Sequence, residues 1–151
     1  MKRIAAVVIV AGIVIVQAAC VSAQSQVGTA TSSNCDGTGV CKVDVSVTQC
    51  FVTPNPSTLT VRARNIDIFW EISDDSYRFS ESDGIKLKQD DSDFDQPQSQ
   101  SNGKKFKLHD KNSKARVGEK ISYAYNIKVQ RLVGTRWVDC GTLDPIIINE
   151  G

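Results

Sequence analysis

Apolar and polar residues alternate along several short stretches of the chain after residue 40, and this period of two predicts β-strands. In residues 42–48 (KVDVSVT) the valines share one face and the polar side chains share the other. Residues 120–132 (KISYAYNIKVQRL) repeat the pattern, and their apolar face is formed by Ile121, Tyr123, Tyr125, Ile127 and Val129. Each stretch is therefore expected to be a strand with one buried face.

Other strands are expected between turn signals. Two prolines in residues 52–57 (VTPNPS) mark a turn or an edge crossing. After them, residues 59–72 alternate in two registers that meet at Asn65, which predicts two short strands or one kinked strand with Trp70 in the core. Shorter strands are expected at Tyr77/Phe79, Ile85/Leu87, Phe106/Leu108, the segment WVDC (137–140) and the final isoleucines (146–148).

This pattern favours an all-β domain. Counting the stretches gives about eight or nine short strands, with turn residues between most of them. No segment after the first 23 residues has the 3.6-residue apolar period of an amphipathic helix. We therefore predict an antiparallel, two-sheet β-sandwich.

The first 23 residues have the layout of a secretory signal peptide. Lys2 and Arg3 precede an uncharged apolar run (4–16), and Val21-Ser22-Ala23 ends in a small-x-small cleavage site. An uncleaved anchor is the alternative, although a membrane-spanning helix needs about 20 apolar residues. Residues 16–20 (VQAAC) resemble a degenerate lipobox, with Gln17 where that motif has an aliphatic residue. Lipidation of Cys20 would tether the domain to a membrane; otherwise the protein is expected to be periplasmic or secreted.

Cleavage before Gln24 leaves one domain's length of chain. Residues 24–34 (QSQVGTATSSN) are small and polar and are expected to be a flexible arm, followed by the sandwich domain at 35–151. Without Lys2 and Arg3 the chain carries 16 basic and 17 acidic residues. This near balance argues against a nucleic-acid partner and against capture by anionic membranes.

The four cysteines of the mature chain predict two disulfides in an oxidising compartment. Three pairings are possible, and we favour Cys35–Cys41, around a glycine-containing turn, together with Cys50–Cys140, between an early and a late strand. A zinc site is disfavoured because the cysteine spacings match no common finger and the chain has one histidine. No cofactor is expected.

An acidic run is the first candidate for chemistry. Asp91, Asp93 and Asp95 match the first ligand positions of a calcium loop, but neither the glycine nor the closing glutamate of that motif follows. The simpler interpretation is a solvated loop whose charge is offset by lysines just after it. As an interaction loop, this region would comprise Asp90, Asp91, Asp93, Asp95, Lys104, Lys105 and Lys107.

His109 is the second candidate, because a hydrolytic triad would have to use this single histidine. Its neighbour Asp110 should point to the opposite face of the strand, so it cannot easily orient the imidazole. We therefore expect a surface histidine and no catalytic residue of this type. Carboxylates gathered only in space, as in glycoside hydrolases, remain an alternative.

Several segments resemble a group of small exported bacterial proteins of unknown function. They are VTPNPSTLTVRARNIDIFWEI, YRFSESDGIKLK, YAYNIKVQRL and DPIIIN, and the resemblance covers residues 42–149. It implies an immunoglobulin-like or cupredoxin-like sandwich. A copper role does not carry over, because the mature chain lacks a second histidine and any methionine.

The leading hypothesis from the sequence is an exported, non-catalytic binding module whose ligand is a protein or a cell-envelope polymer. The acidic loop and its neighbouring lysines would make the contacts, since loops on a rigid sandwich usually carry recognition. There are three alternatives. They are a periplasmic inhibitor or immunity-type protein, a small carboxylate-based hydrolase, and a structural subunit with unpaired edge strands.

Overall fold

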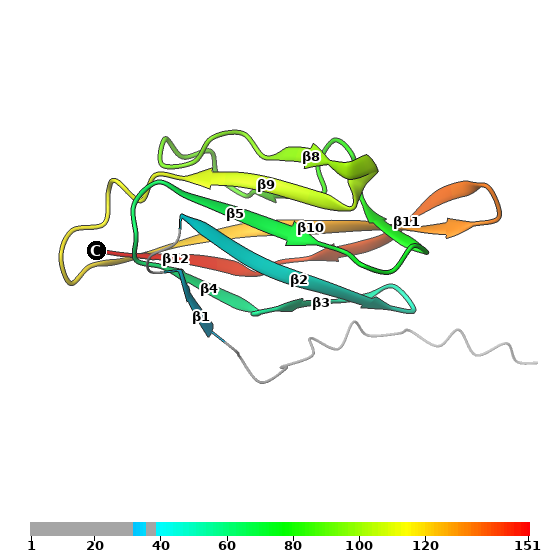
Figure 1. Ribbon diagram of the computed structural model, residues 1–151, viewed down its shortest axis with the longest axis horizontal. Coiled ribbons are helices and arrows are strands. Elements are labelled where there is room, and N and C mark those ends of the chain that lie inside the picture. The colour runs from blue at the N-terminus through cyan, green and yellow to red at the C-terminus, as the bar shows by residue number, and fades with distance from the viewer. Residues whose placement is uncertain (1–31, 36–38) are drawn as a thin grey trace, which may run out of the picture.

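A computed structural model describes residues 32–35 and 39–151, which form two mixed β-sheets around a shared core (Figure 1). The predicted signal peptide, Cys20 and residues 24–31 of the expected arm lie outside the described residues. The seven-stranded sheet has the order β1 (Ser32–Cys35), β4 (Thr58–Val61), β12 (Ile146–Glu150), β10 (Lys120–Val133) and β11 (Arg136–Leu143), and β6 (Tyr77–Phe79) and β7 (Ile85–Leu87) also pair with β10. The five-stranded sheet has the order β3 (Phe51–Asn55), β2 (Val40–Thr48), β5 (Ile66–Glu71), β9 (Lys105–Asp110) and β8 (Gln98–Gln100).

The all-β prediction is confirmed, but the purely antiparallel arrangement and the count of eight or nine strands are wrong. The pairs β1–β4, β4–β12 and β2–β5 are parallel. Parallel pairs arise because the chain leaves the five-stranded sheet after β3, forms β4 in the other sheet, and returns as β5. The additional strands lie at sheet edges: β8 (QSQ) lies within the expected loop, and β1 begins at Ser32, inside the expected arm. The third, β3, includes residues 52–55 of the segment expected to be a turn or an edge crossing.

Asn65 separates two strands that belong to different sheets. Its φ of 57° lies in the left-handed region, which asparagine tolerates better than most residues. The backbone therefore turns between β4 and β5, and the long apolar segment 59–72 contributes to both halves of the core.

The core joins the two sheets through aromatic side chains. Trp70 of β5 is fully buried, as expected, and its Nε1 donates a hydrogen bond to the Tyr125 hydroxyl of β10 at 3.1 Å. Their ring centroids lie 5.4 Å apart. Tyr125, Ile127 and Val129 form the buried face of β10, while Ile121 and Tyr123 are half-buried near its start. The alternation predicted for this strand is therefore present along its middle part.

Replacing Tyr125 with phenylalanine is expected to leave the Trp70 N–H buried without an acceptor. An unsatisfied buried donor costs about 1–3 kcal/mol, so urea unfolding should show a loss of stability in this range. Tyr123→Phe is the matched control, because that hydroxyl makes only a 3.4 Å contact to Asp93 and its ring is half-buried. Equal losses in the two variants would contradict the role given to the Trp70–Tyr125 bond.

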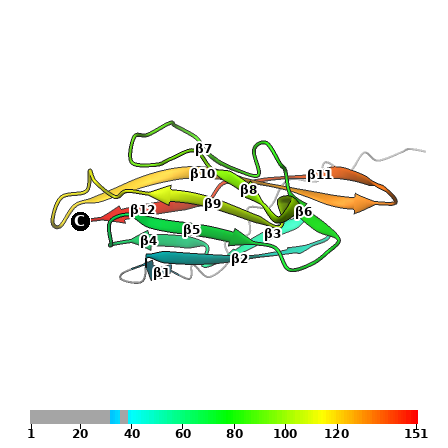
Figure 2. The same cartoon turned by 45° about the horizontal axis from the view of Figure 1, so that its top comes forward.

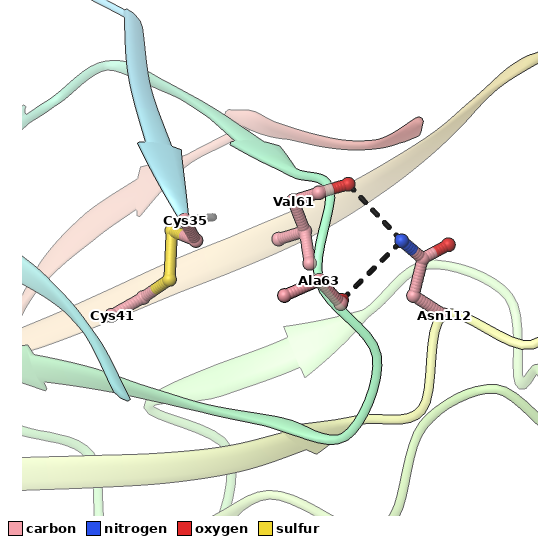
Figure 3. Close-up of a disulfide and its surroundings, with 5 residues drawn as sticks. All are labelled: Cys35, Cys41, Val61, Ala63 and Asn112. Atoms are coloured by element: carbon pink, nitrogen blue, oxygen red, sulfur yellow. Dashed lines mark hydrogen bonds between the residues drawn. A yellow bond between two sulfur atoms is a disulfide. The ribbon is translucent and has the colours of Figure 1, made fainter. Parts of the chain in front are cut away.

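The two disulfides have the pairing that the sequence favoured. Cys35–Cys41 joins β1 to β2, and therefore links the two sheets (Figure 3). Cys50–Cys140 joins the turn between β2 and β3 to β11, with a Cα–Cα distance of 4.8 Å. These bonds indicate folding in an oxidising compartment.

Within residues 32–35 and 39–151, no helix is both long and apolar enough to span a membrane.

Candidate interaction surface

The acidic loop is attached to the body of the protein by its own carboxylates. Asp93 is fully buried, and it accepts hydrogen bonds from the backbone and hydroxyl of Ser113 and from the backbone N–H of Lys114. Asp91 pairs with the Lys114 ammonium at 2.6 Å, and Asp95 pairs with Lys111 at 2.9 Å. Each of the three calcium candidates is therefore engaged by groups of Lys111, Ser113 or Lys114. In the part of the chain that the structure describes, no cluster of three or more acidic, histidine or cysteine side chains could hold a metal ion.

These pairs also set the ionisation of the loop. Desolvation opposes ionisation of Asp91, but hydrogen bonds from Lys114 and from the Asp93 N–H outweigh it and lower the pKa of the Asp91 carboxyl. The hydrogen bond from Lys111 lowers the pKa of Asp95. Both carboxylates are thus charged and already neutralised by lysines of the same chain. Asp90 is the exposed acid of the run that forms no ion pair with the described residues.

The lysines expected beside this loop are engaged elsewhere. Lys104 donates to the carbonyls of Asp74 and Tyr77 at 2.6 and 2.7 Å. Lys105 pairs with Glu71 at 2.6 Å and lies over the Phe69 ring at 4.3 Å. Lys107 pairs with Asp67 at 2.8 Å. None of these contacts involves the acidic run, so the structure does not bring the two halves of the expected interaction loop together.

His109 lies on the outer face of the five-stranded sheet, while Asp110 points into the core. The imidazole Nδ1 is 2.8 Å from a carboxylate oxygen of Asp67, which is directly opposite it on β5. Sequence reasoning missed this pair because it depends on the strand register. Among the described residues, no hydroxyl or thiol group is hydrogen-bonded to His109. The described structure therefore shows no nucleophile paired with this imidazole.

A buried polar cluster closes one end of the core. Asp110 Oδ1 accepts hydrogen bonds from the Asn112 N–H at 2.9 Å and from Asn149 Nδ2 at 3.0 Å. Asn112 Nδ2 in turn donates to the carbonyls of Val61 and Ala63 (Figure 3). Asp110 and Asn149 are fully buried, and Asn112 is 2% exposed. The cluster therefore ties β4, β9 and β12 together and is closed to a substrate.

The cluster carries more acceptors than donors. Asp110 Oδ2, Asn112 Oδ1 and Asn149 Oδ1 are buried without a hydrogen-bond partner. Desolvation raises the pKa of the Asp110 carboxyl to about 6, because a buried carboxylate without a cation is unfavourable. Asp110 is thus poised to carry a proton under mildly acidic conditions.

The β10–β11 hairpin projects beyond the rest of the body (Figures 1 and 2). We call residues 130–139 the distal hairpin. Its turn places Gly134, with a φ of 61°, at the first central position, where a type II′ turn has glycine. Three of its apolar side chains face solvent, with exposed fractions of 41% for Leu132, 48% for Val133 and 50% for Val138.

One face of the distal hairpin combines apolar and basic side chains. The register pairs Arg131 with Val138, and Val133 with Arg136, so these four side chains share a face. Both arginines are exposed, and within the described residues neither forms an ion pair. Among the described residues, the side chains of this basic–apolar face form no ion pair or hydrogen bond.

The opposite face of the distal hairpin is held by contacts to β6. The Arg78 guanidinium lies 4.5 Å from the centre of the Trp137 ring, and Arg78 Nε donates to the Gln130 side-chain oxygen at 3.0 Å. Gln130 then donates to Asp139 at 2.9 Å. The only ring contact of Trp137 among the described residues is therefore with Arg78.

A β-bulge fixes the base of the distal hairpin. The register shifts between Val129 and Gln130, which face Gly141 and Asp139, so Cys140 is left out of the ladder. The Cys50–Cys140 disulfide then attaches this point to the other sheet. The hairpin is thus a short ribbon anchored at its base, with one engaged face and one free face.

A shallow depression on the outer face of β7 and β10 is the other candidate surface. It is lined by Asp83, Lys86, Leu87, Lys88, Asn126, Lys128 and Asp144. Most of its charges are already paired, Lys128 with Asp83 and Lys88 with Asp144. The distal hairpin therefore presents more charged side chains without an ion pair than this depression does.

Comparison of the sequence with models of protein families found no match, and comparison with curated proteins found none either.

Proposed function

We propose that the protein is an exported, non-catalytic binding module that recognises another protein through the distal hairpin. The observation that carries this proposal is the face formed by Arg131, Val133, Arg136 and Val138, which is apolar, basic and without partners in the described residues. Arginine and apolar side chains are typical of interface centres, and a pre-formed hairpin loses little conformational freedom on binding. The two-sheet architecture supports placing the chain among immunoglobulin-like or cupredoxin-like sandwiches as part of the same proposal.

The acidic loop has a smaller part in this proposal than in the hypothesis from the sequence. Its carboxylates are bound by Lys111, Ser113 and Lys114, so a partner would have to break existing contacts to use them. The unengaged charge of the distal hairpin is basic, which favours an acidic partner. An inhibitor or immunity-type protein remains an alternative only if its basic hairpin covers an acidic site on the partner protein.

The hydrolase alternative is less favoured by the same geometry. The inward-facing carboxylates, Asp93 and Asp110, are each fully buried, whereas hydrolytic carboxylates must touch the scissile bond. A structural-subunit role is favoured by one observation, the unpaired edge of β11 in the described residues.

Charge reversal at the distal hairpin tests the proposal. The mature domain, immobilised through its C-terminus, is used to capture proteins from cell-envelope extract. Arg131→Glu/Arg136→Glu is expected to reduce capture of the specifically bound protein by about tenfold or more, because it reverses both free charges. Thermal unfolding should be nearly unchanged, because both side chains are exposed and form no ion pair in the described structure.

Arg64→Glu/Lys86→Glu is the matched control. Both residues are exposed, neither forms an ion pair with the described residues, and the change in net charge is the same. The control should capture as well as the wild type. An equal loss of capture in both double variants would mean that net charge, and not the distal hairpin, governs binding. Undiminished capture by Arg131→Glu/Arg136→Glu would show that the distal hairpin is not the binding surface.

A further inference from the structure

The outer edge of β11 has no hydrogen-bonded partner strand among the described residues, although β3 lies beside it near the Cys50–Cys140 disulfide. β11 pairs with β10 along one side only, whereas β10 is flanked on its other side by β6 and β7. An unpaired edge offers free N–H and C=O groups to an incoming chain. Strand addition at such an edge is a common mode of peptide recognition.

The register shows which backbone groups face outward. In a two-residue hairpin the pair next to the turn, here Val133–Arg136, is hydrogen-bonded, and the pairs then alternate. The backbones of the next pair, Leu132 and Trp137, are therefore not hydrogen-bonded to each other. The Leu132 N–H donates to the Ser76 carbonyl instead. By the same alternation the N–H and C=O groups of Trp137 and Asp139 point to the free edge.

The usable edge is short and fixed in place. The bulge at Cys140 interrupts the regular ladder, so the edge available for pairing is Arg136–Asp139. The Cys50–Cys140 disulfide holds its inner end. An incoming strand would therefore pair over about four or five residues, which is near the usual length of a strand.

The side chains along this edge define the chemistry of the occupant. Arg136 and Val138 lie on the free face, and the neighbouring Arg131 and Val133 extend it. In an added strand, residues two positions apart share that face. An acidic residue beside Arg136 and an apolar residue beside Val138 would complement it. A second copy of this chain would instead gather four arginines on one face, with no carboxylate among them.

We propose that the edge Arg136–Asp139 binds an extended acidic segment of a partner protein by strand addition, with a carboxylate and an apolar side chain two positions apart on the face of Arg136 and Val138. This inference rests on the function proposed above. It adds the binding mode and the class of peptide.

A random-peptide display library, selected on the immobilised mature domain, tests the peptide class. We expect enrichment of sequences with Asp or Glu two positions from an aliphatic or aromatic residue. The affinity of a synthetic selected peptide should fall about tenfold or more with Arg131→Glu/Arg136→Glu and should be unchanged with Arg64→Glu/Lys86→Glu. No enrichment, or enrichment without acidic residues, would overturn the inference.

Amide hydrogen exchange with the same synthetic peptide tests the binding mode. The Trp137 and Asp139 amides should become protected, and a peptide N-methylated at alternate residues should fail to bind, because it lacks pairing donors. Protection elsewhere would overturn strand addition. Protection that rises with protein concentration without peptide would identify a second copy as the occupant. If envelope capture depends on the hairpin arginines but no acidic peptide is selected, the proposed function stands and this inference fails.

Discussion

Replacing Cys50 and Cys140 together with alanine is expected to lower the free energy of unfolding by about 4–5 kcal/mol. The disulfide joins residues 90 positions apart, and such a long closed loop strongly restricts the unfolded chain. Because a domain of this size is stable by only about 5–15 kcal/mol, the variant should be close to unfolding at physiological temperature. Guanidinium unfolding at fixed pH measures the difference.

The matched control is the double alanine variant of Cys35 and Cys41. That disulfide spans six positions, for which the same loop-entropy relation gives about 2–3 kcal/mol. The larger loss should therefore come from Cys50/Cys140. The reverse order would contradict the entropic account, and it would place the main stabilisation at the link between β1 and β2.

Replacing Asp110 with asparagine is expected to stabilise the protein at neutral pH by up to about 3 kcal/mol. The pKa of this carboxyl is raised from 3.8 to about 6, chiefly by desolvation, with a smaller contribution from Asp93. Between these two values the unfolded chain has lost its proton while the folded chain still holds it. The contribution of Asp110 to stability therefore falls as pH rises from about 4 to 6, and it stays low above that range.

Asparagine preserves the acceptor that both hydrogen bonds to Asp110 use, and it removes the ionisation. Urea unfolding between pH 4 and 7.5 should show similar stabilities at pH 4 and a growing advantage of Asp110→Asn toward neutrality. Asp110→Ala should be destabilised throughout, because it leaves two donors unpaired. A variant Asp110→Asn that is less stable than wild type at pH 7.5 would contradict burial of an uncompensated carboxylate.

Strand content was predictable where apolar alternation is strong. The valines at 43, 45 and 47, and the residues around Trp70 and Tyr125, are buried as their spacing indicates. Parallel pairing was not predictable, because it follows from how the chain crosses between sheets after β3, and no local pattern records that crossing. Edge strands such as β8 are polar on both faces, so the pattern gave no signal for them.

The candidate site was predictable only in part. The two strands of the hairpin were evident from residues 120–132 and 137–140. The sharing of one face by Arg131, Val133, Arg136 and Val138, however, depends on the register and on the bulge at Cys140. The aspartates of the acidic loop looked available because their partners, Lys111, Ser113 and Lys114, are about 20 positions away. Charge runs in sequence do not reveal which of their members are neutralised in the fold.

The disulfide and the proposed binding surface are physically connected. Cys140 lies at the bulge from which the distal hairpin projects, so the Cys50–Cys140 bond stabilises the fold and also orients the free edge of β11. An oxidising compartment would thus be required both for stability and for a pre-organised surface. Loss of this bond is expected to weaken binding even under conditions where the sheets remain folded.

Site-specific photo-cross-linking tests the central claim most directly. A benzoylphenylalanine is placed at Val138 on the distal hairpin or, in a second protein, at Asp90 in the acidic loop, and each is irradiated with cell-envelope extract. The account predicts a discrete protein adduct from position 138 that disappears when Arg131→Glu/Arg136→Glu is added, and no such adduct from position 90. A discrete adduct from position 90, with none from position 138, would contradict it.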